Sequence, residues 1–201
     1  AYKHMTNREY LVALYSFIPF GPARIKLLTS YFGSAKKVWN AKKKDLLKVG
    51  LSEKTLLAYE DFRESFEEKE YFKKLKELGI RFITREDPDY PENLLGLDDA
   101  PPVLYVKGKV KAADSNAVAI VGSRKMTSYG REVTEKFAAE LATLGVTIVS
   151  GLARGVDTAA HEAALSVGGR TLAVLGCGLD IIYPPENTQL AKRISESGAL
   201  V

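Results

Sequence analysis

The chain has 201 residues, of which 46% are hydrophobic, and a formal net charge of +4. It is long enough to bury the core of one large domain or of two small ones. No apolar run reaches the length of a membrane span and no signal peptide is recognisable, so we expect a cytoplasmic protein with no membrane partner. The single cysteine, Cys177, excludes an internal disulfide and fits a reducing compartment.

The charge is unevenly distributed along the chain. Residues 1–111 carry 21 Lys and Arg against 16 Asp and Glu, whereas residues 112–201 carry 8 against 9. The second half is therefore not generally basic, and its few arginines predict a focused attraction of anions. Residues 1–4 (Ala-Tyr-Lys-His) resemble a cloning remnant ahead of a native Met5, and they are left out of the fold prediction.

Residues 6–79 are predicted to form a small all-helical domain. Apolar residues recur there at helical spacing, and the stripes are separated by breaks at 19–22, Gly33, Gly50 and Gly79. The short connections between the stripes predict a bundle of the SAM or helix–hairpin–helix type.

Two features of this helical region raise the possibility of a DNA contact. The turn Pro19-Phe20-Gly21-Pro22 resembles a helix–hairpin–helix, whose backbone amides hold a DNA phosphate, but Pro19 stands where the first glycine is expected. We therefore favour a packing role for this turn. The lysine-rich run within residues 36–48 is interpreted as a solvated face in preference to a phosphate-contacting patch.

Residues 80–111 are predicted to be a linker whose strands join the edge of the following sheet. Ile80–Thr84 and Val103–Val106 are typical of short strands, and the segments 87–91 and 101–102 are rich in proline. We place the junction between the two domains within this linker.

Residues 112–201 are predicted to form an incomplete Rossmann-like domain. Apolar runs at Ala117–Val121 and Val146–Val149 flank a helical stretch, and Thr171–Leu175 predicts a third strand. Strand–helix–strand units need crossover connections, so we expect the α/β class with a doubly wound, mainly parallel sheet. Ala199–Val201 resembles the start of a fourth strand, from which we expect the chain to be a fragment.

The predicted strands end in glycines, and arginines follow the first two. Because the carboxyl ends of parallel strands lie at one edge of a sheet, the loops that follow them should meet there. Exposed glycine amides, helix N-termini and arginine side chains attract anions, and a phosphate fits best. The candidate phosphate-binding residues are Gly122, Ser123, Arg124, Gly151, Leu152, Ala153, Arg154, Gly155 and Gly176.

Other ligands of such sheets are disfavoured. A dinucleotide site needs Gly-x-Gly-x-x-Gly after the first strand and an acid after the second, but the first motif is absent and Ser150 holds the second position. No Gly-Lys-Ser/Thr phosphate loop occurs. One cysteine and one native histidine are too few for a typical metal site, so we expect neither a metal nor a cofactor.

Several motifs in a fixed order resemble those of the DNA-processing protein A family, also called DprA or Smf. They lie at residues 121–124, 129–130, 150–161 and 176–187, with two more in the linker at 87–91 and 101–105. The resemblance covers residues 6–201. It implies a bacterial, non-enzymatic protein that binds and protects single-stranded DNA, helps to load the RecA recombinase in natural transformation, and forms a homodimer at full length. The family continues beyond the position of Val201.

Five further residues are expected to support the site. Asp157 and His161 are four positions apart on one helical face, and we favour a structural hydrogen bond between them over an acid–base pair. Cys177, which is not one of these five, is interpreted as a small packed residue and not as a reactive thiol. The residues expected to hold the loop after the third strand in shape are Asp180, Tyr183 and Asn187.

Three functions remain open at this stage. We favour a non-enzymatic binder of single-stranded DNA in which Arg124 and Arg154 converge on one pocket, although no aromatic platform for the bases is identifiable from the sequence. The alternative is a nucleotide-hydrolysing enzyme like the related phosphoribohydrolases, but their Gly-Gly-Gly and Pro-Gly-Gly-x-Gly-Thr loops are absent. The third is a scaffold that binds only the recombinase.

Overall fold

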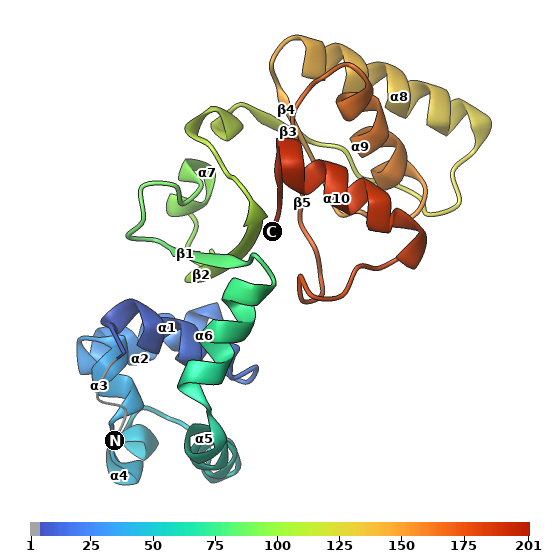
Figure 1. The fold of residues 1–201 in the computed structure, drawn as a ribbon. Coiled ribbons are helices and arrows are strands. Elements are labelled where there is room, and N and C mark those ends of the chain that lie inside the picture. Colours follow the sequence, from blue (N-terminus) through green and yellow to red (C-terminus); the bar gives the residue numbers. More distant parts are fainter. Residues whose placement is uncertain (1–4) are drawn as a thin grey trace.

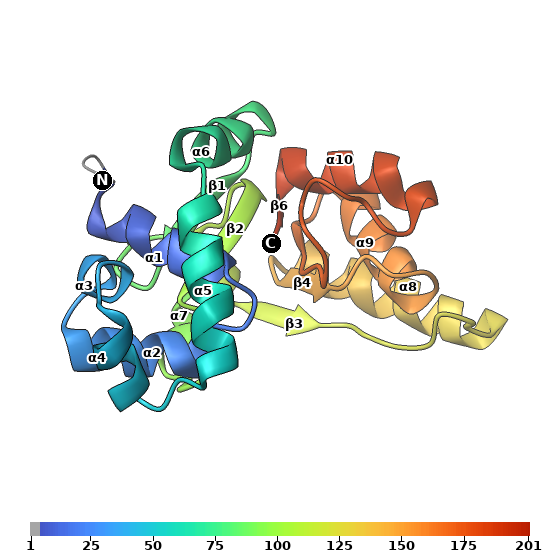
Figure 2. The same cartoon turned by 90° about the horizontal axis from the view of Figure 1, so that it is seen from below.

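The computed structural model describes residues 5–201; residues 1–4, which we interpret as a cloning remnant, lie outside this range. Helices α1 to α6 form one end of the molecule, α8 to α10 form the other, and strands β1 and β2 lie between them (Figure 1). The view from below shows the same division (Figure 2). Across residues 5–201, no helix is both long and apolar enough to cross a bilayer.

Polar N-caps fix where several of the N-terminal helices begin. The Thr6 hydroxyl accepts the Glu9 N–H, and the Glu9 carboxylate accepts the Thr6 N–H at 2.7 Å, which is a capping box. Ser34 and Ser52 cap α3 and α5 through their hydroxyls. The helices are α1 (Asn7–Ser16), α2 (Pro22–Phe32), α3 (Ala35–Trp39), α4 (Lys43–Lys48), α5 (Glu53–Ser65) and α6 (Glu68–Glu77).

An aromatic core holds these helices together. Trp39 and Tyr59 are buried, and their rings meet edge to face with centroids 6.1 Å apart. Phe20 is also buried and packs edge-on against Phe17, with centroids 4.9 Å apart. The turn that resembles a helix–hairpin–helix thus contributes Phe20 to the core, which supports a packing role. The lysines of residues 36–48 are all exposed.

Six strands form one mixed sheet in the order β1-β2-β6-β5-β4-β3. Strands β3 to β6 pair in parallel, β2 pairs antiparallel with β6, and β1 pairs antiparallel with β2. The predicted α/β class with a mainly parallel sheet is confirmed. The strands are β1 (Arg81–Thr84), β2 (Val103–Gly108), β3 (Ala117–Ala119), β4 (Thr147–Ser150), β5 (Thr171–Ala173) and β6 (Ala199–Leu200).

The parallel strands follow one another across the sheet in chain order, so no reversal of strand order occurs among the described strands. The connecting helices lie in a row, with α9 in contact with both α8 and α10. They are α8 (Ser128–Thr143), α9 (Val156–Ser166) and α10 (Thr188–Ser197), and shorter helical turns are α7 (Glu92–Leu95), η1 (Ala112–Ser115) and η2 (Pro185–Asn187). The loops after β3, β4 and β5 are therefore neighbours at one edge of the sheet.

Helices α8 and α9 approach closely because small residues face each other. Ala138 and Ala142 of α8 share one buried cluster with Ala160 and Ala164 of α9. Leu141 of α8 packs against this cluster and is half-buried, whereas Phe137 is 57% exposed. The exposure of Phe137 follows from the place of β3 at the end of the sheet, because no further described strand lies beside that face.

A buried ion pair ties together the amino ends of the parallel strands. The Arg170 guanidinium donates to both carboxylate oxygens of Asp114, whose side chain is 4% exposed. The Thr147 hydroxyl and the Lys111 N–H also donate to this carboxylate, at 2.9 and 2.8 Å. Burial acts to raise the pKa of Asp114, but the hydrogen bonds from Arg170 and Lys111 outweigh it and lower that pKa. The pair thus links the β2–β3 connection to β4 and β5.

We expect Asp114→Ala to lower the free energy of unfolding by about 3–5 kcal/mol, because the Arg170 charge would stay largely buried without its partner. Urea unfolding followed by circular dichroism measures this loss. Asp61→Ala, which removes an exposed acid on α5, serves as the control and should change stability little. Equal losses for the two variants would contradict the proposed importance of the ion pair.

Candidate functional site

A pocket of about 290 Å³ opens at the carboxyl edge of the parallel strands. The loops after β3, β4 and β5 all contribute to it, as the sequence predicts for a ligand site of such a sheet. The lining residues are Arg124, Gly151, Ala153, Arg154, Leu175, Gly176, Cys177 and Tyr183. The remaining predicted phosphate-binding residues lie in the same loops but do not line the pocket; they are Gly122, Ser123, Leu152 and Gly155.

The two arginines face the same pocket. Arg124 is exposed and has no ion pair among the described residues. The Arg154 Nε donates to the carboxylate of Glu186, which does not line the pocket. This hydrogen bond and the positive charge of Arg154 lower the pKa of Glu186, which is therefore ionised at neutral pH. Because Glu186 engages Nε, the two terminal nitrogens of the guanidinium stay available to an anion.

The loop after β3 and the loop after β4 touch through their backbones. The Val156 N–H donates to the Ser123 carbonyl at 3.2 Å. Gly155, the last residue of the loop after β4, has φ +82°, and a Cβ there would collide with the Ser123 carbonyl and the Arg124 backbone. A Cβ on Gly122 would lie 2.8 Å from the Val156 side chain. Glycine at these positions permits the close approach that brings Arg124 to the pocket.

Some of the predicted amides are available to an anion and others are not. Within residues 5–201, no hydrogen bond engages the backbone N–H of Ser123, Arg124 or Arg154. The N–H groups of Gly151 and Ala153 instead donate to the buried Asp157 carboxylate, at 3.1 and 3.3 Å. In the loop after β4, Arg154 is therefore the residue with donors available to an anion. Gly151 contributes mainly its small size.

Leu152 belongs to the core and not to the surface of the pocket. Its side chain is fully buried, although its backbone is left-handed with φ +61°. The Asn187 side-chain amide donates to the Leu152 carbonyl and to the Thr158 hydroxyl, both at 2.8 Å. The buried Asn187 thus holds the loop after β4, whereas the sequence suggested a role in the loop after β5 alone. It also anchors η2, from which Glu186 reaches Arg154.

The loop after β5 exposes two residues that the sequence suggested would be supporting or packed. Tyr183 is 58% exposed and lines the pocket. Cys177 is exposed there too, so its interpretation as a packed residue is wrong. The Asp180 carboxylate pairs with Lys74 of α6 at 3.4 Å, and its role in the shape of this loop stays a prediction. The sequence feature that could have identified Tyr183 as a pocket residue is an aromatic ring next to two prolines in a loop that follows a strand.

His161 does not pair with Asp157, so the predicted hydrogen bond between them is wrong. Its Nδ1 bonds to the Thr171 hydroxyl at 2.7 Å, and that hydroxyl donates to the Ile148 carbonyl, so Nδ1 carries the proton. Nε2 is buried and has no hydrogen-bond partner within residues 5–201. Burial lowers the pKa of His161 to about 4, because a proton on Nε2 would be charged and unpaired.

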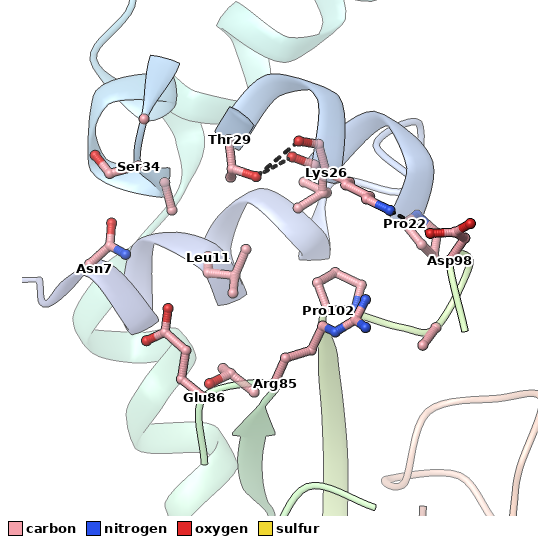
Figure 3. Close-up of a pocket in the computed structure, with 15 residues that line it drawn as sticks. Asn7, Leu11, Pro22, Lys26, Thr29, Ser34, Arg85, Glu86, Asp98 and Pro102 are labelled. Atoms are coloured by element: carbon pink, nitrogen blue, oxygen red, sulfur yellow. Dashed lines mark hydrogen bonds and ion pairs between the residues drawn. The ribbon is translucent and has the colours of Figure 1, made fainter. Parts of the chain in front are cut away.

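A second pocket, of about 270 Å³, lies between α1, α2 and the segments beside β1 and β2 (Figure 3). Several of its polar groups already have hydrogen-bond partners in the protein. Lys26 pairs with Asp98 at 2.8 Å, and the Thr29 hydroxyl donates to carbonyls of its own helix. Arg85 donates to the Leu95 carbonyl. We therefore place the candidate site at the sheet edge. Within residues 5–201, no three His, Cys, Asp or Glu side chains cluster as metal ligands.

These features define a class of protein, namely a Rossmann-like α/β protein with a cationic pocket at the carboxyl edge of its parallel strands and a helical region before the sheet. A family model for DNA recombination-mediator protein A matches residues 81–201. The chain belongs to this family, as its motifs predict.

Known relatives agree with this assignment. Protein Smf of Synechocystis is 37% identical over 204 residues, which cover 98% of this chain and 51% of that protein. The X-ray structure of DNA processing protein A from Streptococcus pneumoniae matches with a TM-score of 0.79 at 29% identity and covers 98% of this chain and 66% of that one. DNA processing protein A from Helicobacter pylori, which binds single-stranded DNA, matches with a TM-score of 0.52 at 38% identity. The match covers 60% of this chain and 54% of that one. The chain spans about half the length of the Synechocystis relative.

We expect Gly155→Ala to lower the thermal unfolding temperature clearly more than Gly145→Ala does. Both glycines have a positive φ, +82° at 155 and +80° at 145, so an alanine is strained at either position. Gly155 also has ψ −125°, which lies outside the left-handed helical region. Only the new methyl group at 155 meets other atoms, whereas nothing lies within 4 Å at 145. Differential scanning calorimetry measures the two unfolding temperatures. Similar falls in both variants would contradict the expectation that the close approach of the two loops requires glycine at position 155.

We expect the stability of the protein to fall as the pH is lowered from 6.5 to 4. The unfolded chain protonates His161 near pH 6.5, but the folded protein does so only near pH 4, so protons favour unfolding in this window. At pH 4 the protonation of His161 in the unfolded chain lowers the free energy of unfolding by about 3 kcal/mol. His161→Asn removes this titration, so unfolding free energies of the variant should depend less on pH. Parallel pH profiles for the two proteins would contradict the expectation.

Proposed function

We propose that the pocket at the sheet edge binds the phosphate backbone of single-stranded DNA and that the protein is a non-enzymatic DNA-processing protein. The observation that carries this proposal is the convergence of Arg124 and Arg154 on one pocket. Amides that have no partner within residues 5–201 lie in the same loops, and arginine with backbone N–H is the usual donor set for phosphate. The single-stranded DNA binding of the Helicobacter pylori relative supports this choice of polyanion.

The family supports a wider role, which we also propose. In it the protein acts in the cytoplasm, protects incoming single strands, and helps to load the RecA recombinase during natural transformation, as a homodimer at full length. The matched relatives are named for DNA processing and recombination mediation. A pocket that holds phosphates without reading base edges suits a protein that must bind any incoming sequence.

The composition of the pocket argues for binding over hydrolysis. Its lining residues include no carboxylate and no histidine. Asp157, the acid nearest in sequence to the arginine loop, is 7% exposed and accepts two backbone hydrogen bonds. A group held in this way is poorly placed to act as a general base. The phosphoribohydrolase alternative therefore has less support than single-stranded DNA binding.

We expect Arg124→Ala and Arg154→Ala each to weaken binding of a fluorescent oligothymidylate about tenfold, because each removes a charge-assisted hydrogen bond to phosphate. Each variant should also reduce the slope of log affinity against log salt by about 0.7, as one fewer counterion is released. Fluorescence anisotropy at several salt concentrations measures both effects.

Arg193→Ala, which removes an exposed arginine of α10 that does not line the pocket, is the matched control. It should leave the affinity and the salt slope nearly unchanged. Wild-type affinity in both pocket variants would exclude the pocket as the DNA site, and equal losses in all three variants would indicate a diffuse charge effect.

A further inference from the structure

Tyr183 is the one aromatic residue among the lining residues of the arginine pocket. Its side chain is 58% exposed, so the ring presents its surface to solvent at the opening and does not pack into the core. The remaining lining residues are the two arginines, an aliphatic leucine, and small residues of the strand-end loops. An exposed tyrosine beside phosphate-binding groups is the arrangement that single-strand binders use to stack bases.

The segment that carries Tyr183 is fixed to the rest of the site. Two prolines follow it, and η2 begins at Pro185. Asn187, at the end of η2, bonds to the Leu152 carbonyl and to the Thr158 hydroxyl. The backbone segment that carries the ring is therefore anchored to the loop of Arg154, so less of this segment has to be ordered when a base stacks on the ring.

We propose that Tyr183 is a stacking platform for one nucleobase of the bound strand, and that this contact makes the site prefer unpaired over duplex DNA. The inference rests on the proposed function. In a single strand the base next to a bound phosphate is free to present its face to a ring. In a duplex that face is already covered by neighbouring bases, so the same site would gain the phosphate contacts alone.

The test compares two fluorescent oligomers of equal length, an oligothymidylate and a strand in which every nucleotide is an abasic tetrahydrofuran unit. Both carry the same phosphates, but only the first has bases. Tyr183→Ala should weaken binding of oligothymidylate about tenfold. The same variant should leave the affinity for the abasic strand and the salt slope unchanged. Tyr183→Phe should stay within about twofold of wild type on both oligomers, since it keeps the ring.

Tyr31→Ala is the matched control, because Tyr31 is also 58% exposed but lies on α2, outside the pocket. It should change neither affinity. An equal loss of both oligomers in Tyr183→Ala would overturn the proposal, because the residue would then act on the phosphates. A loss in Tyr183→Phe as large as in Tyr183→Ala would also overturn it, because the hydroxyl and not the ring would matter.

The failure of this inference is distinguishable from failure of the proposed function. If wild type binds both oligomers, the two pocket-arginine variants weaken both, and Tyr183→Ala weakens neither, then only the stacking platform is refuted. If wild type binds neither oligomer, or the arginine variants bind like wild type, then the phosphate pocket itself is refuted and the stacking platform with it.

Discussion

The arginine pocket depends on one backbone contact, the approach of the loop after β3 to the start of α9. The Val156 N–H reaches the Ser123 carbonyl, and Gly155 provides the room for it. This contact holds Arg124 beside the loop of Arg154, so both arginines line the same pocket. Like charges held together repel, and an anion between them removes that repulsion. If the pocket binds phosphate as we propose, the fold brings its two arginines together before the ligand arrives.

Contacts that bridge distant parts of the chain complete the site. Glu186 holds one side of the Arg154 guanidinium, and Asn187 holds the Leu152 carbonyl, although more than 30 residues separate the members of each pair. The segment after β5 is thus a scaffold for the loop after β4 as well as a wall of the pocket. The Glu186 carboxylate is therefore compatible with the proposed phosphate site, because it orients the arginine from outside the lining.

The sequence was sufficient to predict the features that depend on local patterns. The parallel strands follow from apolar runs, and the edge loops follow from glycine and arginine at strand ends. Other features depend on tertiary packing and were missed. The carboxylate of Asp157 takes the amides of Gly151 and Ala153, His161 bonds to a strand and not along its own helix, and the apolar face of α8 is exposed beside the edge strand. Sequence spacing does not reveal which partner a polar group selects.

The chemistry of the loop after β5 has a practical consequence. Cys177 is the only cysteine of the chain, it is exposed, and it lines the pocket. A thiol-reactive fluorophore would therefore attach at one known position without removal of any other cysteine. Its emission would report the polarity of the pocket, and protection of the thiol from alkylation would report occupancy. The natural sequence thus supplies its own reporter of what enters the site.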